Sequence, residues 1–356
     1  MKTSLTVIDL FCGAGGLTFG FKRAGYRIVF ALDVDWDAIR TYTANNPGIP
    51  WINKDIRKVA VEEIQNVAEI KAGDIDVIMA GIPCEGYSLL NRRYDPSDPR
   101  NYLFVEFMRV VKKLKPRSVL IENVPGLLRR ENGGFRKVIE NSLEKLGFNT
   151  SSFTLNAVDF GVPQKRTRLF FIGLSSNKKF EPPCPTHGTS ESLLSFINLT
   201  RPHVTVWDAI SDLPQLQPGE EKNQYESEPR TEYQKLMREG SSKLYNHRAP
   251  NHPEWTVRLI EKTRPGASLY ETFRQRIRLR WDEPSPTIPA GGVRPQWFFA
   301  HPGQPRGITV REMARLQSFP DTYIFHGSLI KQRVLVGDAV PPLLAEVIAR
   351  KLAEYI

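Results

Sequence analysis

One cysteine in this chain stands where a nucleophile would be useful. Cys84 lies in the segment GIPCEGYS, directly after the apolar run DVIMA, which is typical of a buried strand. The carboxyl ends of parallel strands line the ligand site of an α/β sheet, and a thiolate there is a strong nucleophile. A single cysteine is more often a small buried apolar side chain, so both interpretations stay open on this residue alone.

Charged residues accompany the next strand-like segments along the chain. Glu122 ends the run SVLIE, which would place a carboxyl group beside Cys84. Arg166 and Arg168, in QKRTR, precede the run LFFIGL and are expected to point the same way, as alternate residues of a strand do. Arginines before strands are commonly solvated, but a cysteine, a glutamate and two arginines at successive strand ends predict a reactive site.

A glycine-rich turn near the start predicts a second kind of site. VIDLFCGAGG reads as a strand that turns into a helix, where glycines let the backbone approach a ligand closely. The next strand-like run ends at Asp33, where a carboxylate can accept hydrogen bonds from ribose, and Asp55 ends a third run. These features fit a dinucleotide or S-adenosylmethionine. The turn lacks the GxGxxG spacing that favours a dinucleotide, and an ordinary turn without a ligand stays open.

The elements that would position these residues alternate as in an α/β domain. We expect a doubly wound, mostly parallel sheet. Apolar runs predict strands at Leu5–Leu10, Tyr26–Asp33, Val77–Ala80, Ser118–Glu122 and Arg168–Leu174. Helical periodicity predicts helices at Trp36–Asn45, Tyr102–Leu114 and Phe135–Leu146.

The composition changes after this α/β region. Proline and polar residues become frequent from about residue 178, and the polar stretch Pro214–Glu239 is typical of a surface insert. Helical patterns return at TVREMARLQSF and at Pro341–Ile356. We therefore expect a large α/β domain over 1–177, a smaller, irregular domain over 178–308, and a C-terminal segment over 309–356 that returns to the first domain.

Overall composition narrows the class of protein. Among 356 residues the formal net charge is +10, which favours a polyanionic partner such as nucleic acid, although a merely basic soluble protein has the same balance. Three cysteines, an odd number placed far apart, suit a reducing cytoplasm. No long apolar run predicts a membrane span, and the first apolar residues read as a strand rather than a signal peptide. The segment CPTH lacks a second ligand pair, so we expect no metal site.

One basic segment alternates with a period of two residues. In FRQRIRLRW, a strand would place four arginines on one face, where they would meet phosphates or guanine edges; they are Arg274, Arg276, Arg278 and Arg280. A solvated strand face is the alternative interpretation.

Taken together, these motifs resemble the cytosine-C5 DNA methyltransferase family. The resemblance covers nearly the whole chain, in the order DLFCGAGG, LDVD, GIPCEGYS, ENVPG, QKRTR, DEPSPTI, REMARLQSFPD and GDAVPP. It implies the fold of S-adenosylmethionine-dependent methyltransferases and the methylation of cytosine at C5 within a specific double-stranded DNA sequence. It also implies that residues 1–177 form the catalytic and cofactor-binding domain, 178–308 a smaller, irregular target-recognition domain, and 309–356 a hinge and C-terminal segment. A bacterial restriction-modification enzyme is the expected type, acting as a monomer in the cytoplasm, with a separate restriction endonuclease as a further partner.

The resemblance also implies the chemistry. Cys84 would add to C6 of a cytosine flipped out of the duplex, which makes C5 nucleophilic. Glu122 would hydrogen-bond N3 and the exocyclic amine, while Arg166 and Arg168 would hold the O2 edge and a nearby phosphate. The loop 89–101 would close on the flipped base, with DNA contacts at Ser88, Arg92 and Arg93; a solvated surface loop is the alternative interpretation.

The cofactor contacts implied by the resemblance follow the ends of the first strands. They are Asp9, Phe11, Gly13, Gly15 and Gly16 for the methionine part, Asp33 for the ribose, Asp55 and Ile56 for the adenine, Pro83 and Leu103 for the pocket lining, and Asp338 near the methionine end. The product would be S-adenosylhomocysteine.

Two residues depart from the usual family spelling. Glu85 stands where glutamine is usual, and we expect its charge to disfavour the Cys84 thiolate. Asp338 stands where asparagine is usual. Two alternatives remain beside DNA methylation. A tRNA-methylating relative is disfavoured because the Cys-Phe-Thr segment of that branch is missing, and a catalytically silent DNA-binding regulator is disfavoured by intact Cys84, Glu122 and Arg166.

Overall fold

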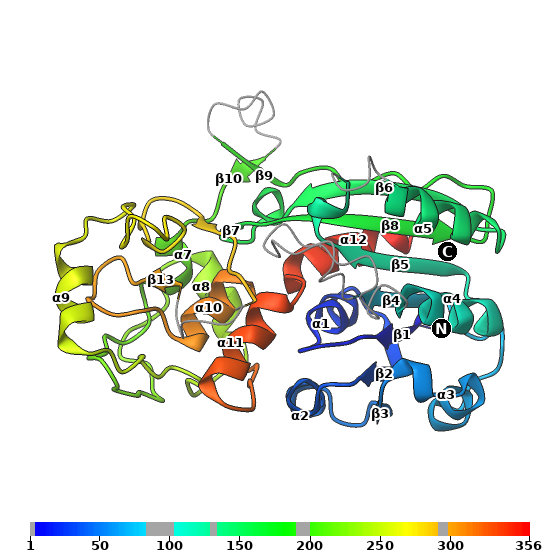
Figure 1. Ribbon diagram of the computed structural model, residues 1–356, viewed down its shortest axis with the longest axis horizontal. Helices are drawn as coiled ribbons and strands as arrows, with labels where there is room; N and C mark the ends of the chain where they lie inside the picture. The colour runs from blue at the N-terminus through cyan, green and yellow to red at the C-terminus, as the bar shows by residue number, and fades with distance from the viewer. Residues whose placement is uncertain (1–3, 83–102, 129–133, 190–199, 291–297) are drawn as a thin grey trace. The chain divides into compact units, whose positions relative to one another are not determined.

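The computed structural model describes residues 4–82, 103–128, 134–189, 200–290 and 298–356. The chain forms two compact units, and Figure 1 shows their elements. The first unit combines residues 1–156, 167–184 and 344–356; the second combines 157–166 and 185–343. These boundaries differ from the expected ones chiefly because residues 309–343 cluster with the second unit rather than with the first.

The first unit is built on a seven-stranded sheet in the order β3-β2-β1-β4-β5-β8-β6. Neighbours from β3 to β5 are parallel, and β8 is antiparallel to both β5 and β6. The strands are β1 (Thr6–Leu10), β2 (Arg27–Asp33), β3 (Trp51–Asn53), β4 (Val77–Gly81), β5 (Ser118–Asn123), β6 (Asn149–Asn156) and β8 (Thr167–Leu174). The expected doubly wound, mostly parallel sheet is confirmed.

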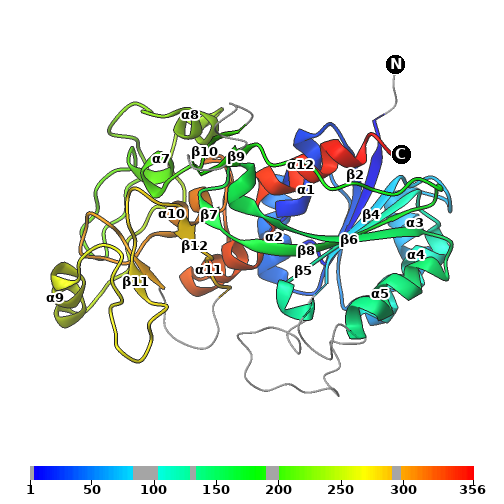
Figure 2. The same ribbon diagram turned by 90° about the horizontal axis from the view of Figure 1, so that it is seen from above.

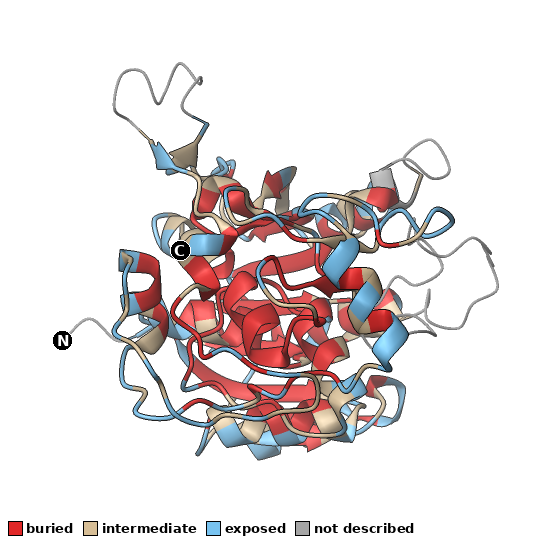
Figure 3. Cartoon of the chain, turned by 90° about the vertical axis from the view of Figure 1, so that its left-hand side faces the viewer, coloured by how far each residue is buried: buried red, intermediate tan, exposed pale blue. Residues whose placement is uncertain are grey.

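Helices cover both faces of this sheet. Figure 2 shows α3, α4 and α5 on one face and α1, α2 and α12 on the other. Their bounds are α1 (Gly16–Arg23), α2 (Trp36–Asn45), α3 (Val61–Ala68), α4 (Leu103–Leu114), α5 (Gly134–Glu144) and α12 (Pro342–Leu352), with short 3-10 turns η1 (Ile56–Lys58), η4 (Pro125–Leu128) and η6 (Ala157–Phe160). Because parallel strands are covered on both faces, their residues are apolar and buried along almost the whole length (Figure 3).

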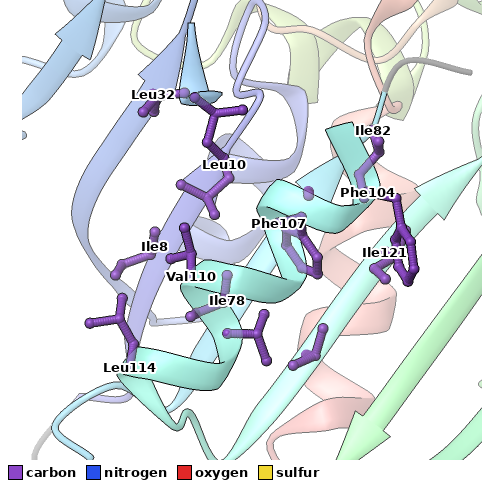
Figure 4. Close-up of a cluster of buried hydrophobic side chains, with 14 of the residues drawn as sticks. Ile8, Leu10, Leu32, Ile78, Ile82, Phe104, Phe107, Val110, Leu114 and Ile121 are labelled. Atoms are coloured by element: carbon purple, nitrogen blue, oxygen red, sulfur yellow. The ribbon is translucent and has the colours of Figure 1, made fainter. Parts of the chain in front are cut away.

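The main core lies between the sheet and the helices on one face. Figure 4 shows Ile8, Leu10, Ile78 and Ile121 from the strands packed with apolar side chains of α4 such as Phe107. Each of these five side chains is fully buried, and burial of one such side chain stabilises the fold by about 1.5–3 kcal/mol. This core fixes the carboxyl ends of β1, β4 and β5 relative to one another.

The five predicted strands and three predicted helices of this unit are found within two residues of their expected bounds. The closing helix predicted at Pro341–Ile356 is also found, as α12. Strand β6 and helix α3 were not predicted from the sequence.

The second unit has little regular structure. Its helices are α7 (Val206–Ile210), α8 (Glu232–Arg238), α9 (Glu254–Lys262), α10 (Val310–Leu316) and α11 (Leu329–Asp338). Its two-residue strands are β7 (Gln164–Lys165), β9 (His187–Gly188), β10 (Arg201–Pro202), β11 (Ile277–Arg278), β12 (Ser285–Pro286) and β13 (Phe299–Ala300). Across the residues that the structure describes, no helix is long and apolar enough to cross a membrane.

The structure differs from two expectations about the second unit, in part for the first and fully for the second. The polar stretch Pro214–Glu239 is not entirely surface, because α8 within it buries Tyr233, Gln234 and Met237 and begins at a capping box between Thr231 and Gln234. The segment Phe273–Trp281 is not a continuous strand either. Only Ile277–Arg278 pairs with a neighbour, so the segment does not present four arginines on one strand face.

Candidate active site

The expected chemical site lies at the carboxyl ends of β4 and β5. These parallel strands pair Gly81 directly with Glu122. A Cβ atom at Gly81 would lie 3.5 Å from Oε2 of Glu122, so the carboxylate stands beside the end of β4, three residues before Cys84 in the sequence. Cys84 and Pro83 themselves lie outside the described residues, as do Ser88, Arg92 and Arg93.

Glu122 is held by an ion pair with Arg168. Nε of Arg168 lies 2.9 Å from Oε1 of Glu122, and the two side chains are 11% and 10% exposed. In the antiparallel β5–β8 pair, Glu122 is opposite Phe170, which places Arg168 two residues along the same face. A charge pair this well covered is costly to form and holds the carboxylate in one orientation, with its second oxygen beside Gly81.

Asn123 joins the two strand ends and was not among the predicted site residues. It is buried, and its Nδ2 donates to the carbonyl oxygen of Ile82 at 3.4 Å while its Oδ1 accepts from the backbone N–H of Val124 at 2.8 Å. The bond to Ile82 ties the end of β5 to the segment that follows β4, and the bond from Val124 holds the amide in the orientation that makes it. The ENV motif contains Asn123, but only a buried amide between two strand ends reveals this positioning role.

Arg166 has a different environment from Arg168. It is 1% exposed and belongs to the second unit, where its guanidinium donates to the carbonyl oxygens of Ile288 at 3.0 Å, Gly337 at 2.6 Å and Ala339 at 3.2 Å. The expectation that Arg166 and Arg168 point the same way was wrong. Arg166 lies between β7 and β8, which belong to different sheets, so the two arginines are not alternate residues of one strand.

The glycine-rich turn closes against the end of β2. The backbone N–H of Gly13 donates to Oδ2 of Asp33 at 2.8 Å, and Oδ1 of the same carboxylate accepts from the N–H of Asp35 at 2.9 Å. Phe11, Gly13 and Gly15 have φ angles of 61°, 53° and 84°, a left-handed turn that brings the backbone around the end of β1. Burial raises the pKa of Asp33, and the bonds from Gly13 and Asp35 oppose this.

Asp9 faces the interior of the unit. Its side chain is fully buried and accepts a hydrogen bond of 2.7 Å from the Thr18 hydroxyl, which is in turn 2.9 Å from the Tyr42 hydroxyl. The other carboxylate oxygen has no hydrogen-bond partner within the described residues. Burial raises the pKa of Asp9 to about 7, Thr18 opposes the rise, and the charge of Asp33 adds to it.

The remaining predicted cofactor residues lie at several strand and helix ends. Asp55 caps η1 through the N–H of Arg57, and its hydrogen bonds with Arg57 lower its pKa. Ile56 is 1% exposed, and Leu103 begins α4 in a half-buried position. Gly16 begins α1, and Asp338 ends α11 with an exposed side chain.

Two exposed tryptophans stand near the ends of β2 and β3 and were missed in the sequence. Trp36 begins α2 directly after Asp35, and Trp51 begins β3; they are 55% and 39% exposed, with ring centroids 6.2 Å apart. An exposed aromatic pair at a strand edge is the kind of surface on which a planar ring stacks. In the sequence, each reads as an ordinary aromatic residue at the start of an element.

The arginines predicted to read DNA have internal contacts. Nη1 of Arg278 donates to the carbonyl oxygens of Ile260 at 3.0 Å and Thr263 at 2.9 Å at the end of α9, and Arg280 pairs with Asp282. The guanidinium of Arg276 lies over the Phe273 ring, with its carbon 4.7 Å from the ring centroid. Arg274 lies in an exposed turn of the same segment.

Comparison with known proteins agrees with this architecture. The family model for C-5 cytosine-specific DNA methylase matches residues 5–354. Type II methyltransferase M.DdeI of Desulfomicrobium norvegicum is 36% identical over 99% of this chain and 89% of its own length. Type II methyltransferase M.AgeI of Thalassovita gelatinovora is 34% identical over 99% of both proteins.

Solved structures show the same fold. A crystal structure described as a DNA modification methyltransferase encoded within an E. coli prophage matches with a TM-score of 0.80, 28% identity and 99% coverage of both chains. A structure of a Spodoptera frugiperda DNMT2 variant matches with a TM-score of 0.63 over 98% of this chain, but at 17% identity it supports the fold alone. The chain therefore belongs to the C-5 cytosine-specific DNA methylase family and is a cytosine-C5 DNA methyltransferase.

Proposed function

We propose that this enzyme methylates a cytosine flipped out of a specific double-stranded DNA sequence, with Cys84 as nucleophile and with Glu122 and Arg168 as the residues that activate the ring. The Glu122–Arg168 ion pair beside the end of β4 is the observation that carries the proposal. It sets a fixed carboxylate next to the segment that leads into Cys84, at the edge of the sheet where α/β enzymes bind their substrates.

The chain's residues have separate tasks in this reaction. The Cys84 thiol loses its proton and its sulfur bonds to C6, so the electron pair of the C5–C6 double bond moves into the ring and makes C5 nucleophilic. Glu122 accepts a hydrogen bond from the exocyclic amine, which favours cytosine over uracil, and in its protonated form it donates to N3, which stabilises that charge. Arg168 keeps the Glu122 carboxylate oriented. Once C5 carries its methyl group, the C5 proton leaves and the bond between Cys84 and C6 breaks.

S-adenosylmethionine supplies the methyl group when it is bound, and the ends of β1, β2 and β3 fit this molecule. Gly13 and Gly15 lead the backbone through a left-handed turn, where a ligand can approach without meeting a side chain. We assign the ribose to Asp33, the adenine to Asp55 and Ile56, and a stacking contact with the adenine to Trp36. Asp9 supports the turn from inside through Thr18.

A covalent trap tests this proposal. A duplex that carries 5-fluorocytosine at the target position cannot lose a proton from C5, so the bond between Cys84 and C6 is expected to persist. Wild-type enzyme with S-adenosylmethionine should form a complex that survives denaturing electrophoresis. Cys84→Ser should form none, and Glu122→Gln should form it at least about 100-fold more slowly. Trapping at a normal rate by Cys84→Ser would contradict the proposal.

We further propose that the enzyme acts as a monomer in the cytoplasm, beside a separate restriction endonuclease. The names of the relatives M.DdeI and M.AgeI, both Type II methyltransferases, support the part of this proposal that concerns restriction-modification. Methylation-sensitive sequencing of DNA from cells that express the protein should reveal one short methylated sequence. Methyl incorporation into tRNA rather than duplex DNA, or a dimer in sedimentation measurements, would contradict this assignment.

A further inference from the structure

Arg109 of helix α4 holds the short turn η1, to which the proposed function assigns the adenine of the cofactor. Its Nη2 donates to the carbonyl oxygens of Ile56 at 3.0 Å and of Val59 at 2.9 Å. Ile56 is the first residue of η1, and Val59 directly follows its last residue. One guanidinium nitrogen therefore binds the turn at both ends. Arg109 was not among the predicted site residues.

The turn η1 has few hydrogen bonds of its own. The N–H of Lys58 donates to the carbonyl oxygen of Asp55 at 2.8 Å. The N–H of Val59 donates to that of Ile56 at 3.2 Å. A 3-10 turn this short gains little free energy from its own bonds to offset the entropy of ordering the chain. Buried side chains of Ile56 and Val59 hold it on the core, and the bonds from Arg109 restrain its backbone.

Helix α4 gives Arg109 a fixed position. Phe104, Phe107 and Val110 of this helix are buried in the main core, packed with side chains of the strands (Figure 4). Close-packed core side chains leave a helix little freedom to shift. Nε of Arg109 also lies 2.7 Å from Oε2 of Glu106, one helical turn earlier. This partly exposed pair adds little stability, but it limits the directions in which the guanidinium can point.

The orientation of the Asp55 carboxylate depends on the same turn. Its Oδ1 accepts a hydrogen bond of 3.0 Å from the backbone N–H of Arg57, a residue within η1, so its direction follows the backbone of the turn. Hydrogen bonds with the Arg57 side chain lower the pKa of Asp55, so near neutral pH this carboxylate only accepts hydrogen bonds. The amino group of adenine is a donor that matches such an acceptor, whereas hypoxanthine has an oxygen at that position.

We propose that Arg109 is a positioning residue that makes the cofactor site selective for adenine. The inference rests on the proposed assignment of the adenine to Asp55 and Ile56. By holding both ends of η1, Arg109 keeps the Asp55 carboxylate where it accepts a hydrogen bond from the adenine amino group. A displacement of about 1 Å is enough to lose such a bond. Arg109 supports binding of the adenine and does not contact the reacting atoms, so its loss affects KM rather than kcat.

Two substitutions at residue 109 and one control test this proposal. Arg109→Met removes every donor and keeps an apolar stem, while Arg109→Lys keeps a donor on a flexible chain. Lys113→Met is the control, because Lys113 lies on the same helix but pairs with Glu62 of α3, at 3.2 Å. At saturating DNA, the KM for S-adenosylmethionine should rise about 10-fold in Arg109→Met and about 3-fold in Arg109→Lys, with kcat unchanged. The control should match wild type.

A pair of inhibitors separates positioning from a merely structural role. S-adenosylhomocysteine carries the adenine amino group, and S-inosylhomocysteine carries an oxygen in its place. Wild type should bind the first about 30-fold more tightly in calorimetric titrations, because the second leaves the Asp55 carboxylate without its donor. Arg109→Met should bind the first about 10-fold more weakly and the second as wild type does, so the ratio falls to about 3. Arg109→Lys should give an intermediate ratio.

The outcomes distinguish this inference from the proposed function on which it rests. Equal weakening of both inhibitors by Arg109→Met, or of neither, would overturn the role of Arg109. A ratio for Arg109→Lys that equals that of wild type would overturn it where Arg109→Met does not fold. If wild type methylates DNA but does not distinguish the two inhibitors, the adenine is not at Asp55 and the inference fails with that assignment. If wild type methylates no duplex, the proposed function itself fails.

Discussion

At the scale of single residues, the two arginines of QKRTR have different roles: one contacts a residue of the candidate site and the other stabilises the fold. Arg168 pairs with Glu122, whereas Arg166 donates to three backbone carbonyl oxygens. Arg168→Lys keeps the charge but loses the planar guanidinium that orients the carboxylate. We expect the single-turnover methylation rate to fall about 100-fold while the melting temperature stays close to that of wild type.

Arg166→Lys is the matched control, with the opposite expected result. A lysine cannot donate to all three carbonyl oxygens in this arrangement, so buried acceptors lose their partners. Unfolding free energy should fall by about 2 kcal/mol or more, as measured by urea denaturation. If Arg168→Lys lowers stability and spares the rate, the two assignments are reversed.

The residue types of this site were predictable from the sequence, but the different roles of the two arginines and of Asn123 were not. Cys84, Glu122 and the arginine pair were recognisable because their chemistry fits strand ends in a known order. The separation of Arg166 from Arg168 depends on where β8 begins, and the alternation of side chains applies only within one strand. The role of Asn123 depends on a contact with Ile82, 41 residues away.

Asp9 predicts a pH dependence of stability. In the folded unit its pKa is raised to about 7 from an ordinary value of 3.8, chiefly by burial. Well below pH 4 the carboxyl is neutral in both the folded and the unfolded chain, so it does not change the free energy of unfolding. As pH rises to about 7 the unfolded chain releases its proton first, so this group lowers the stability of the fold. The full cost, on the order of 4 kcal/mol, is reached above pH 7.

Asp9→Asn isolates this contribution because the amide stays neutral and can still accept the bond from Thr18. The unfolding free energy of the variant minus that of wild type should increase between pH 5 and pH 8. Urea denaturation at these two pH values measures the difference. A difference that stays constant or decreases with pH would show that Asp9 is ionised in the folded unit at pH 5.

At the scale of elements, the end of α11 is set by close backbone packing. A Cβ atom at Gly337 would lie 2.3 Å from the carbonyl oxygen of Pro289 and 2.7 Å from Cα of Ala290, distances that require the backbone to move. Gly337→Ala should therefore lower the unfolding free energy by about 3 kcal/mol. The exposed neighbour Asp338 offers a control, since Asp338→Asn should leave thermal unfolding unchanged. Equal melting temperatures for both variants would refute the packing argument.

Elements with strong apolar periodicity were the ones the sequence predicted well. The strands β1, β2, β4, β5 and β8 are continuous apolar runs because helices cover both faces of the sheet. Strand β6, with the sequence NTSSFTLN, has few apolar residues and forms by pairing with β8 rather than by its own pattern. For the segment Phe273–Trp281 the sequence predicted a strand that the structure does not contain. Its arginines alternate as strand residues would, but they contact carbonyl oxygens, carboxylates and an aromatic ring instead.

At the scale of the whole chain, the first unit is completed by residues far apart in the sequence. Residues 344–356 belong to it together with residues 1–156. Glu346 pairs with Arg23 at 2.6 Å, and the Tyr26 hydroxyl donates to the carbonyl oxygen of Ala349 at 2.9 Å. These contacts join α12 to the end of α1 and the start of β2, which Figure 2 shows side by side. The turn that carries Gly13 and Gly15 lies between β1 and α1, so its support includes α12.

Ile348→Ala tests this dependence. Ile348 is fully buried in α12, and truncation of such a side chain costs about 2–4 kcal/mol. Since α12 packs beside α1, amide hydrogens of α1 and β2 should exchange faster in the variant, and affinity for S-adenosylmethionine should fall with them. Lys351→Ala, on the more exposed side of the same helix, should change neither measurement. Normal exchange in α1 together with a lower melting temperature would mean that α12 stabilises the unit without supporting the glycine turn.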